Sequence, residues 1–213
     1  VAHLDVPPAI WEAAAASLLR RLAGVLPADI RVTRVGAAPP GFDARFAALA
    51  RRYAYRVSDD PAGVDPLRRH EVIWHARRLD LAAMRAAAVP LLGTHDFAAF
   101  CRRRAGASTV RTLLRLDWER DRAGFAVATV EADAFCHSMV RALIGALLVV
   151  GEGRRATSWP AGVLAARVRS PEVTVLAARG LTLEEVRYPP EDLLARRVAL
   201  ARQVRTLGPA RPS

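Results

Sequence analysis

The sequence predicts an α+β fold built on an antiparallel sheet. Segments 110–118 and 125–131 both look like strands and flank a short charged turn, a pattern typical of an antiparallel hairpin. The remaining strand-like and helix-like segments do not alternate regularly, as a doubly wound parallel sheet would require. With 213 residues, 52% of them hydrophobic, the chain can also bury a sizeable core.

The other elements follow from the spacing of apolar residues and from capping and turn signals. Period-two segments predict strands, spacings of three to four predict helices, and Asp80 is a typical helix N-cap. We expect, in chain order, a strand at 1–6, a helix at 9–22, a strand at 30–35, a strand ending the segment 42–57, a short strand at 72–76, a helix at 81–92, the hairpin, a helix from Ser138 to Gly151, a helix at 159–168, a strand at 181–188 and a helix at 191–205.

Residues 131–145 join a strand pattern to a helical one, and Arg141 lies just past the junction. Met139, Leu143 and Leu147 recur at the spacing of one buried helix face. Gly145 lies one turn beyond Arg141, where glycine costs about 1 kcal/mol relative to alanine. We therefore expect another part of the chain, or a ligand, to pass close to this helix. The simpler alternative is an amphipathic core helix with one solvated arginine.

The charge of the chain points to a polyanionic partner. The formal net charge is +11 and the pI about 11.3, and all 32 basic residues other than histidine are arginine. The arginines occur in clusters separated by apolar segments, unlike a disordered basic tail. This pattern favours a folded nucleic-acid-binding protein.

The cysteines and the apolar runs argue against other classes. Cys101 and Cys136 form no CxxC pair, so neither a disulfide nor a zinc site is expected and a reducing, cytoplasmic compartment is the default. His70 and His75 lack a third ligand at a suitable spacing, so no metal is expected. Arginines interrupt every apolar run before it could cross a bilayer, which excludes a membrane protein.

Four segments together resemble the tRNA pseudouridine synthase A (TruA) family. They are FDARFAALARRYAYRV, GTHDFAAF, ADAFCHSMVRALIGALLVVG and ARGLTLEEVRYP, which occur in the family's order. The resemblance implies the pseudouridine synthase fold, with two ferredoxin-like (RRM-like) subdomains and antiparallel sheets. On this basis residues 1–41 are the remnant of an incomplete N-terminal subdomain, 42–190 form the C-terminal catalytic and RNA-binding subdomain, and 191–213 form a C-terminal helix and tail.

The resemblance has one important departure. The family's GRTDAGVHA segment, which carries the catalytic aspartate, does not occur in these 213 residues, and no aspartate of the chain stands in a GRTD context. Residues 1–6 resemble the strand that follows that segment in the family. We therefore interpret the sequence as N-terminally truncated and expect it to be inactive alone. Leu176 also departs from the family, which has proline there.

The resemblance assigns three residues to the site. Arg141 matches the arginine that pairs with the aspartate nucleophile, Tyr53 matches the active-site tyrosine, and Leu181 matches a leucine that lines the uridine pocket. Without the resemblance, Tyr53 and Leu181 would be interpreted as ordinary sheet residues. Isomerising uridine to pseudouridine involves no net redox change, so the family chemistry implies no cofactor and no metal.

The family's activity also implies partners. The substrate is tRNA, modified at positions 38–40 of the anticodon stem-loop, and a homodimer shares it. Candidates for phosphate contacts are arginines in three clusters, although each could equally be a solvated surface residue: Arg51, Arg52, Arg102, Arg103, Arg104, Arg154 and Arg155. Two alternatives remain, a non-catalytic RNA-binding module on the same platform and, with less support, a DNA-binding protein.

Overall fold

The chain forms two compact units in the computed structural model, which describes residues 1–102, 104, 106–203 and 206. The first unit is Val1–Ala47 together with Pro189–Arg202, and Ala48–Tyr188 makes up the main part of the second.

Among the described residues of the first unit, helices are the only regular secondary structure. They are α1 (Pro8–Ala14), the 3-10 turn η1 (Ala15–Ser17), α2 (Leu18–Val25), η6 (Glu191–Leu193) and α6 (Leu194–Ala201). The helix expected at 9–22 is confirmed, with a 3-10 turn in its middle. The strands expected at 1–6 and 30–35 are wrong, because both segments are irregular. Their alternating pattern has no neighbouring strand in this unit to pair with, and an isolated strand is not stable.

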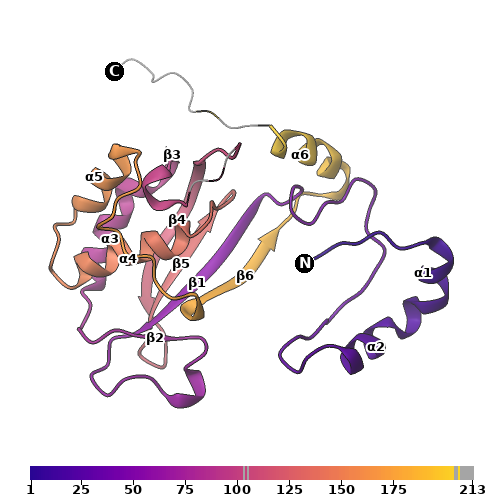
Figure 1. Ribbon diagram of the computed structural model, residues 1–213, viewed down its shortest axis with the longest axis horizontal. Helices are drawn as coiled ribbons and strands as arrows, with labels where there is room; N and C mark the ends of the chain where they lie inside the picture. The colour runs from indigo at the N-terminus through magenta and orange to yellow at the C-terminus, as the bar shows by residue number, and fades with distance from the viewer. Residues whose placement is uncertain (103, 105, 204–205, 207–213) are drawn as a thin grey trace. The chain divides into compact units, whose positions relative to one another are not determined.

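The second unit is built on a six-stranded sheet (Figure 1). Its strands are β1 (Ala50–Ser58), β2 (Ile73–Trp74), β3 (Gly93–Asp96), β4 (Val110–Arg120), β5 (Ala126–Ala132) and β6 (Leu181–Arg187). The order is β2-β1-β5-β4-β3, with β6 also pairing with β1. All pairs are antiparallel except the short β1–β2 pair. The expected α+β class and the β4–β5 hairpin are confirmed.

Helices cover one face of this sheet (Figure 1). They are α3 (Leu81–Ala88), α4 (Met139–Gly151) and α5 (Trp159–Ala166), with the 3-10 turns η2 (Pro66–Arg68), η3 (Val89–Leu91), η4 (Ala98–Phe100) and η5 (Ala178–Gly180) in the connections. Asp80 caps α3 as expected, because its carboxylate accepts hydrogen bonds from the backbone N–H groups of Ala82 and Ala83. Pro90 lies in η3, directly after the end of α3.

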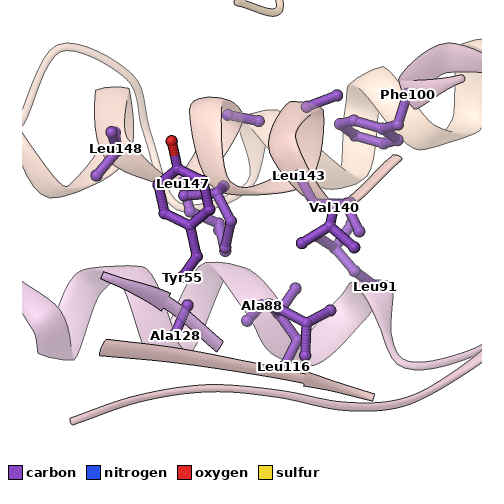
Figure 2. Packing of buried hydrophobic residues seen from close by; sticks show 14 of the residues in the cluster. Tyr55, Ala88, Leu91, Phe100, Leu116, Ala128, Val140, Leu143, Leu147 and Leu148 are labelled. Carbon is purple, nitrogen blue, oxygen red and sulfur yellow. The ribbon is translucent and has the colours of Figure 1, made fainter. Parts of the chain in front are cut away.

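The core lies between these helices and the sheet. Tyr55, Leu143 and Leu147 are among its fully buried side chains (Figure 2). Strand alternation places Tyr55 and Val57 in this core, while Ala54 belongs to a small second cluster with other residues of the opposite face. This alternation matches the sequence pattern. No helix among the described residues is long and apolar enough to span a bilayer.

Candidate active site

Arg141 lies in the first turn of α4, and its side chain is half-buried. Its guanidinium donates hydrogen bonds to the backbone oxygen of Leu176 at 3.1 Å and to Oγ of Ser138 at 3.3 Å. No carboxylate of a described residue lies within ion-pair distance of this guanidinium. A guanidinium has five N–H donors. The two hydrogen bonds therefore fix the orientation of this half-buried side chain and leave donors available for an anion.

The segment after α5 passes directly over Gly145. A Cβ added at Gly145 would collide with the backbone oxygen of Thr174 and would lie 3.6 Å from Cγ of Leu176. The backbone N–H of Leu176 also donates to the backbone oxygen of Arg141 at 3.4 Å. The close approach expected from the glycine is thus confirmed. The missing side chain of Gly145 lets the 174–177 segment pack against α4, where Arg141 donates a hydrogen bond to it.

Tyr53 projects from β1 and is half-buried against the core. Its ring packs edge-on against the ring of Phe135, with centroids 5.2 Å apart and planes at 84°. In the sheet Tyr53 pairs with Val130 of β5 and Leu183 of β6. The ring therefore has a fixed neighbour on one edge and remains partly open to solvent, as a stacking platform for a base requires.

The short segment 135–138 contacts both predicted site residues. Phe135 packs on Tyr53, and three residues later Ser138 accepts a hydrogen bond from Arg141. Ser138 adopts a left-handed backbone conformation, with φ of 69°, as the chain turns from the end of β5 into α4. One tight turn thus holds the phenol and the guanidinium at the same end of β5 and α4.

Tyr55 shows that the charge of Arg141 lies on the same face of the sheet as the tyrosines. Burial raises the pKa of Tyr55 to about 12, and the positive charges of Arg141 and Arg179 oppose that rise. The Tyr55 hydroxyl donates to the backbone oxygen of Ala177 at 2.7 Å. Because Tyr53 is two residues away along β1, it projects from this same face. Tyr55 itself is a core residue, as expected.

Leu181 begins β6 and pairs with Tyr55 in the sheet. It is half-buried and packs on the same core as Tyr53. The preceding residue, Gly180, leaves room for the Tyr55 ring, because a Cβ there would lie 2.9 Å from the ring's outermost carbon. Leu181 is thus fixed on the face that carries both tyrosines, which is compatible with a pocket lining and equally with a core role.

The predicted phosphate-contacting arginines differ in their partners. Arg52 pairs with Glu184 and Glu185, Arg154 with Glu152, and Arg155 with Glu172. Arg51 donates to the backbone oxygen of Asp133 at 3.2 Å. Arg102 and Arg104 are exposed, and Arg103 lies outside the described residues. Within this set, Arg51 is bonded to Asp133, two residues before the turn 135–138, and the backbone of Arg102 is bonded to His137 in that turn.

The arginine-rich loop, residues 102–107, is tied to that turn. The backbone N–H of Arg102 donates to the backbone oxygen of His137 at 3.0 Å. Cys101 and Cys136 form a disulfide, with Cα atoms 5.8 Å apart. The expectation of unpaired cysteines is therefore wrong, because the end of η4 and the loop after β5 meet in space although 35 residues separate them in the sequence.

No group of three or more potential metal ligands occurs among the residues that the structure describes. His75 instead pairs with Glu152, its Nε2 lying 3.0 Å from the carboxylate. The guanidinium of Arg141 can bind and orient an anion, and the half-buried ring of Tyr53 can orient a planar ring.

Comparison with known proteins decides the family. The chain is 62% identical over 97% of its length to tRNA pseudouridine synthase A of Streptomyces griseus, and it covers 73% of that protein. The chain belongs to the tRNA pseudouridine synthase A family. Its identity is 59% to the tRNA pseudouridine synthase A of Frankia casuarinae and 47% to that of Mycobacterium leprae, over 96% and 97% of the chain and 74% and 76% of those proteins. The tRNA pseudouridine synthase family pattern matches residues 87–189.

The family match includes contacts that the sequence interpretation missed. Phe135 lies inside one of the four segments that resemble the family, but nothing in its spacing indicated the edge contact with Tyr53. The backbone oxygens of Leu176 and Ala177 accept hydrogen bonds from Arg141 and Tyr55. Because backbone groups are the same at every residue, the sequence gives no indication of these two contacts. Only the glycine at position 145 indicated that a segment passes there.

Proposed function

We propose that this chain provides the tRNA-binding and base-positioning part of an enzyme that isomerises uridine to pseudouridine at positions 38–40 of the tRNA anticodon stem-loop. The observation that carries the proposal is that one turn, 135–138, contacts both Tyr53 and Arg141. Related proteins are named tRNA pseudouridine synthase A. The enzyme acts in the cytoplasm as a homodimer that shares one tRNA between its subunits.

The reaction breaks the C–N glycosidic bond of uridine, turns the base and forms a C–C bond at C5. A carboxylate nucleophile must be ionised for this, and a guanidinium beside it stabilises the charged form and directs it through paired hydrogen bonds. Arg141 is suited to that role, because its two protein hydrogen bonds leave further N–H donors unused.

Tyr53 supplies the surface on which the base is held. Stacking of uracil on an aromatic ring contributes about 1 to 3 kcal/mol and tolerates rotation of the base. Phe135 keeps the ring from turning with the substrate, since it packs on its edge. The phenol is then a candidate for accepting the C5 proton. The target uridine must leave its stack, at a cost of a few kcal/mol, which phosphate contacts from Arg51 and Arg102 help to offset.

The nucleophilic carboxylate is not identified within this sequence. No GRTD segment occurs in the 213 residues, and no carboxylate of a described residue lies within ion-pair distance of Arg141. We therefore expect the chain alone to bind tRNA without forming pseudouridine, and to be active when a GRTD-bearing segment accompanies it.

The test is release of hydrogen from C5 of uridine, which the new C–C bond displaces. An unmodified tRNA transcript tritiated at uridine C5 is incubated with the chain alone and with the product of the coding sequence extended upstream. Tritium release by the extended protein only, lost in Arg141→Ala and kept in the matched control Arg122→Ala, is the expected result. Arg122 is an exposed arginine in the β4–β5 turn, at the other end of β5.

The competing function is a non-catalytic RNA-binding module. It is favoured by the same absence of a carboxylate partner for Arg141 among the described residues. If the upstream DNA encodes no in-frame GRTD segment and the chain still binds tRNA, this second function replaces the first. Binding of duplex DNA in preference to tRNA at matched salt would exclude both.

A further inference from the structure

The disulfide between Cys101 and Cys136 lies beside the proposed tRNA site. Cys136 directly follows Phe135, which packs on Tyr53, and lies two residues before Ser138, which binds Arg141. Cys101 directly precedes Arg102, the first residue of the arginine-rich loop. This covalent link therefore connects the turn that contacts Tyr53 and Arg141 to the start of the arginine-rich loop, where Arg102 is exposed.

The arginine-rich loop has a firm base. There the backbone N–H of Phe97 donates to the backbone oxygen of Thr109 at 3.1 Å, and the carboxylate of Asp96 accepts from the Thr109 hydroxyl. Beyond that base, the described part of the loop is joined to the turn 135–138 by the hydrogen bond from Arg102 to His137 and by the adjoining disulfide. Breaking the disulfide would leave that hydrogen bond to hold Arg102 beside the site.

The pair is accessible from one side. Cys101 is only 2% exposed, whereas Cys136 is half-buried and is the more exposed residue of the two. The Cα separation of 5.8 Å lies in the ordinary range for a disulfide, so neither oxidation nor reduction requires the backbone to rearrange. A geometry of this kind suits a bond that forms and breaks while the fold persists.

We propose that Cys101 and Cys136 are a reversible dithiol–disulfide site that exchanges with low-molecular-weight thiols and disulfides and thereby couples tRNA binding to oxidation. This inference rests on the proposed function only for its second half, the coupling to tRNA. In the oxidised form the disulfide and the hydrogen bond from Arg102 to His137 together hold Arg102 against the turn 135–138, and in the reduced form the hydrogen bond alone holds it. The oxidised form is the tighter binder, because Arg102 is held in place before tRNA arrives.

Oxidation of the two protein thiols requires one small disulfide and no other reagent. The Cys136 thiolate attacks one sulfur of the small disulfide, breaking its S–S bond and releasing one small thiolate. The Cys101 thiolate then attacks the Cys136 sulfur of the mixed disulfide and releases the second small thiolate. The two protons lost by the protein thiols end on the two released thiols. Reduction is the same sequence in reverse, with two small thiols consumed.

The first experiment follows the bond itself. The purified chain is equilibrated with mixtures of reduced and oxidised glutathione, and its free thiols are counted by alkylation and intact mass. The expected result is loss of both thiols together, and their return with excess reduced glutathione. The double variant Cys101→Ser, Cys136→Ser is the control that cannot form the link. Two thiols that stay free in oxidised glutathione overturn the proposal.

The second experiment separates this inference from the proposed function. Trypsin cleaves after Arg102 and Arg104, and we expect cleavage there to be roughly tenfold faster in the reduced chain than in the oxidised one. The serine double variant should be cleaved at the reduced rate under both conditions. Equal rates for oxidised and reduced wild type contradict the restraint of the loop, whether or not the chain binds tRNA.

The third experiment measures tRNA affinity at fixed salt. The oxidised chain should bind roughly three- to tenfold more tightly than the reduced chain, and the serine double variant should show no redox dependence. A redox-independent affinity overturns the coupling to tRNA. Absence of tRNA binding in both states instead refutes the proposed function, and the proteolysis result then decides the redox site on its own.

Discussion

Arg141 and Leu176 are joined by two hydrogen bonds of opposite direction. The backbone N–H of Leu176 donates to the backbone oxygen of Arg141, and the Arg141 guanidinium donates to the backbone oxygen of Leu176. An arginine that reaches a neighbouring segment in this way is oriented by the fold before any substrate is present. The room for that segment comes from Gly145, whose missing side chain admits Thr174.

Gly145→Ala should therefore destabilise the protein. The new Cβ would collide with a backbone oxygen, which cannot rotate away, so the 174–177 segment must shift at a cost of about 1 to 3 kcal/mol. Gly162→Ala in α5 is the matched control, because nothing lies within 4 Å of its Cβ position, and it should gain up to about 1 kcal/mol. Urea unfolding measures both, and equal stabilities for the two variants would rule out the close approach.

Tyr55→Phe should lower the free energy of unfolding by about 1 kcal/mol, because the backbone oxygen of Ala177 loses its donor. The variant should also change the alkaline stability. The folded-state pKa of Tyr55 is raised to about 12, so its contribution is complete below the unfolded pKa of about 10 and is lost as pH rises towards 12.

The pH profile of unfolding checks this sign. Between pH 10 and 12 the wild type should lose up to about 1.4 kcal/mol per pH unit through this group, and Tyr55→Phe should lose less. A variant with the same alkaline slope as the wild type would show that Tyr55 is not responsible.

Asp59 is a buried carboxylate, only 1% exposed, that joins the end of β1 to β4. It accepts hydrogen bonds from Arg120, from Arg78 and from the backbone N–H of Leu79. Burial acts to raise its pKa, but the hydrogen bonds from Arg120 and Leu79 and the charges of Arg120 and Arg78 outweigh burial and hold the pKa at about 2.

Because this pKa is depressed, the stabilisation is present above the unfolded pKa of about 3.9 and is lost as pH falls towards 2. Asp59→Asn should cost about 3 to 5 kcal/mol at neutral pH and flatten the acid limb of the stability curve. Glu119→Gln, an exposed neighbour on β4, should do neither. Acid titration of unfolding distinguishes them, and an unchanged acid limb in Asp59→Asn would refute the assignment.

Reduction of the disulfide should also lower the free energy of unfolding. Closing a loop across 35 residues restricts the unfolded chain by roughly 3 to 4 kcal/mol. Denaturant unfolding with and without a thiol reductant measures the difference, with the Cys101→Ser, Cys136→Ser variant as the reference that does not respond. A wild type with identical midpoints in both conditions would mean that the bond does not constrain the chain.

Local patterns predicted the second unit well. Alternation along β1 places Tyr55 in the core beneath the helices and Ala54 in the small cluster on the opposite face, as the sequence pattern indicated. Gly145 predicted a close neighbour because glycine weakens a helix interior, a cost that a tightly packed segment offsets. The same alternation at 1–6 and 30–35 gave a wrong prediction, since a strand forms only where a partner strand is present.

The missed features are those that depend on distant parts of the chain. Cys101 precedes β4 and Cys136 follows β5, and the antiparallel pairing of these two strands brings the two cysteines together. Their spacing in the sequence does not indicate this contact. Arg52 is paired with Glu184, which is 132 residues away in the sequence, and no local pattern could indicate that pairing. Phe135 became part of the site only through its contact with Tyr53.

The central claim is that Tyr53 and Arg141 act on one uridine. The most direct measurement is a double-variant cycle on tritium release from tRNA under single-turnover conditions, using the catalytically competent protein. The cycle comprises the wild type, Tyr53→Phe, Arg141→Lys and the double variant. Residues that act together give a double variant little slower than the slower single variant. Fold-losses that simply multiply, or single variants as fast as the wild type, would contradict the claim.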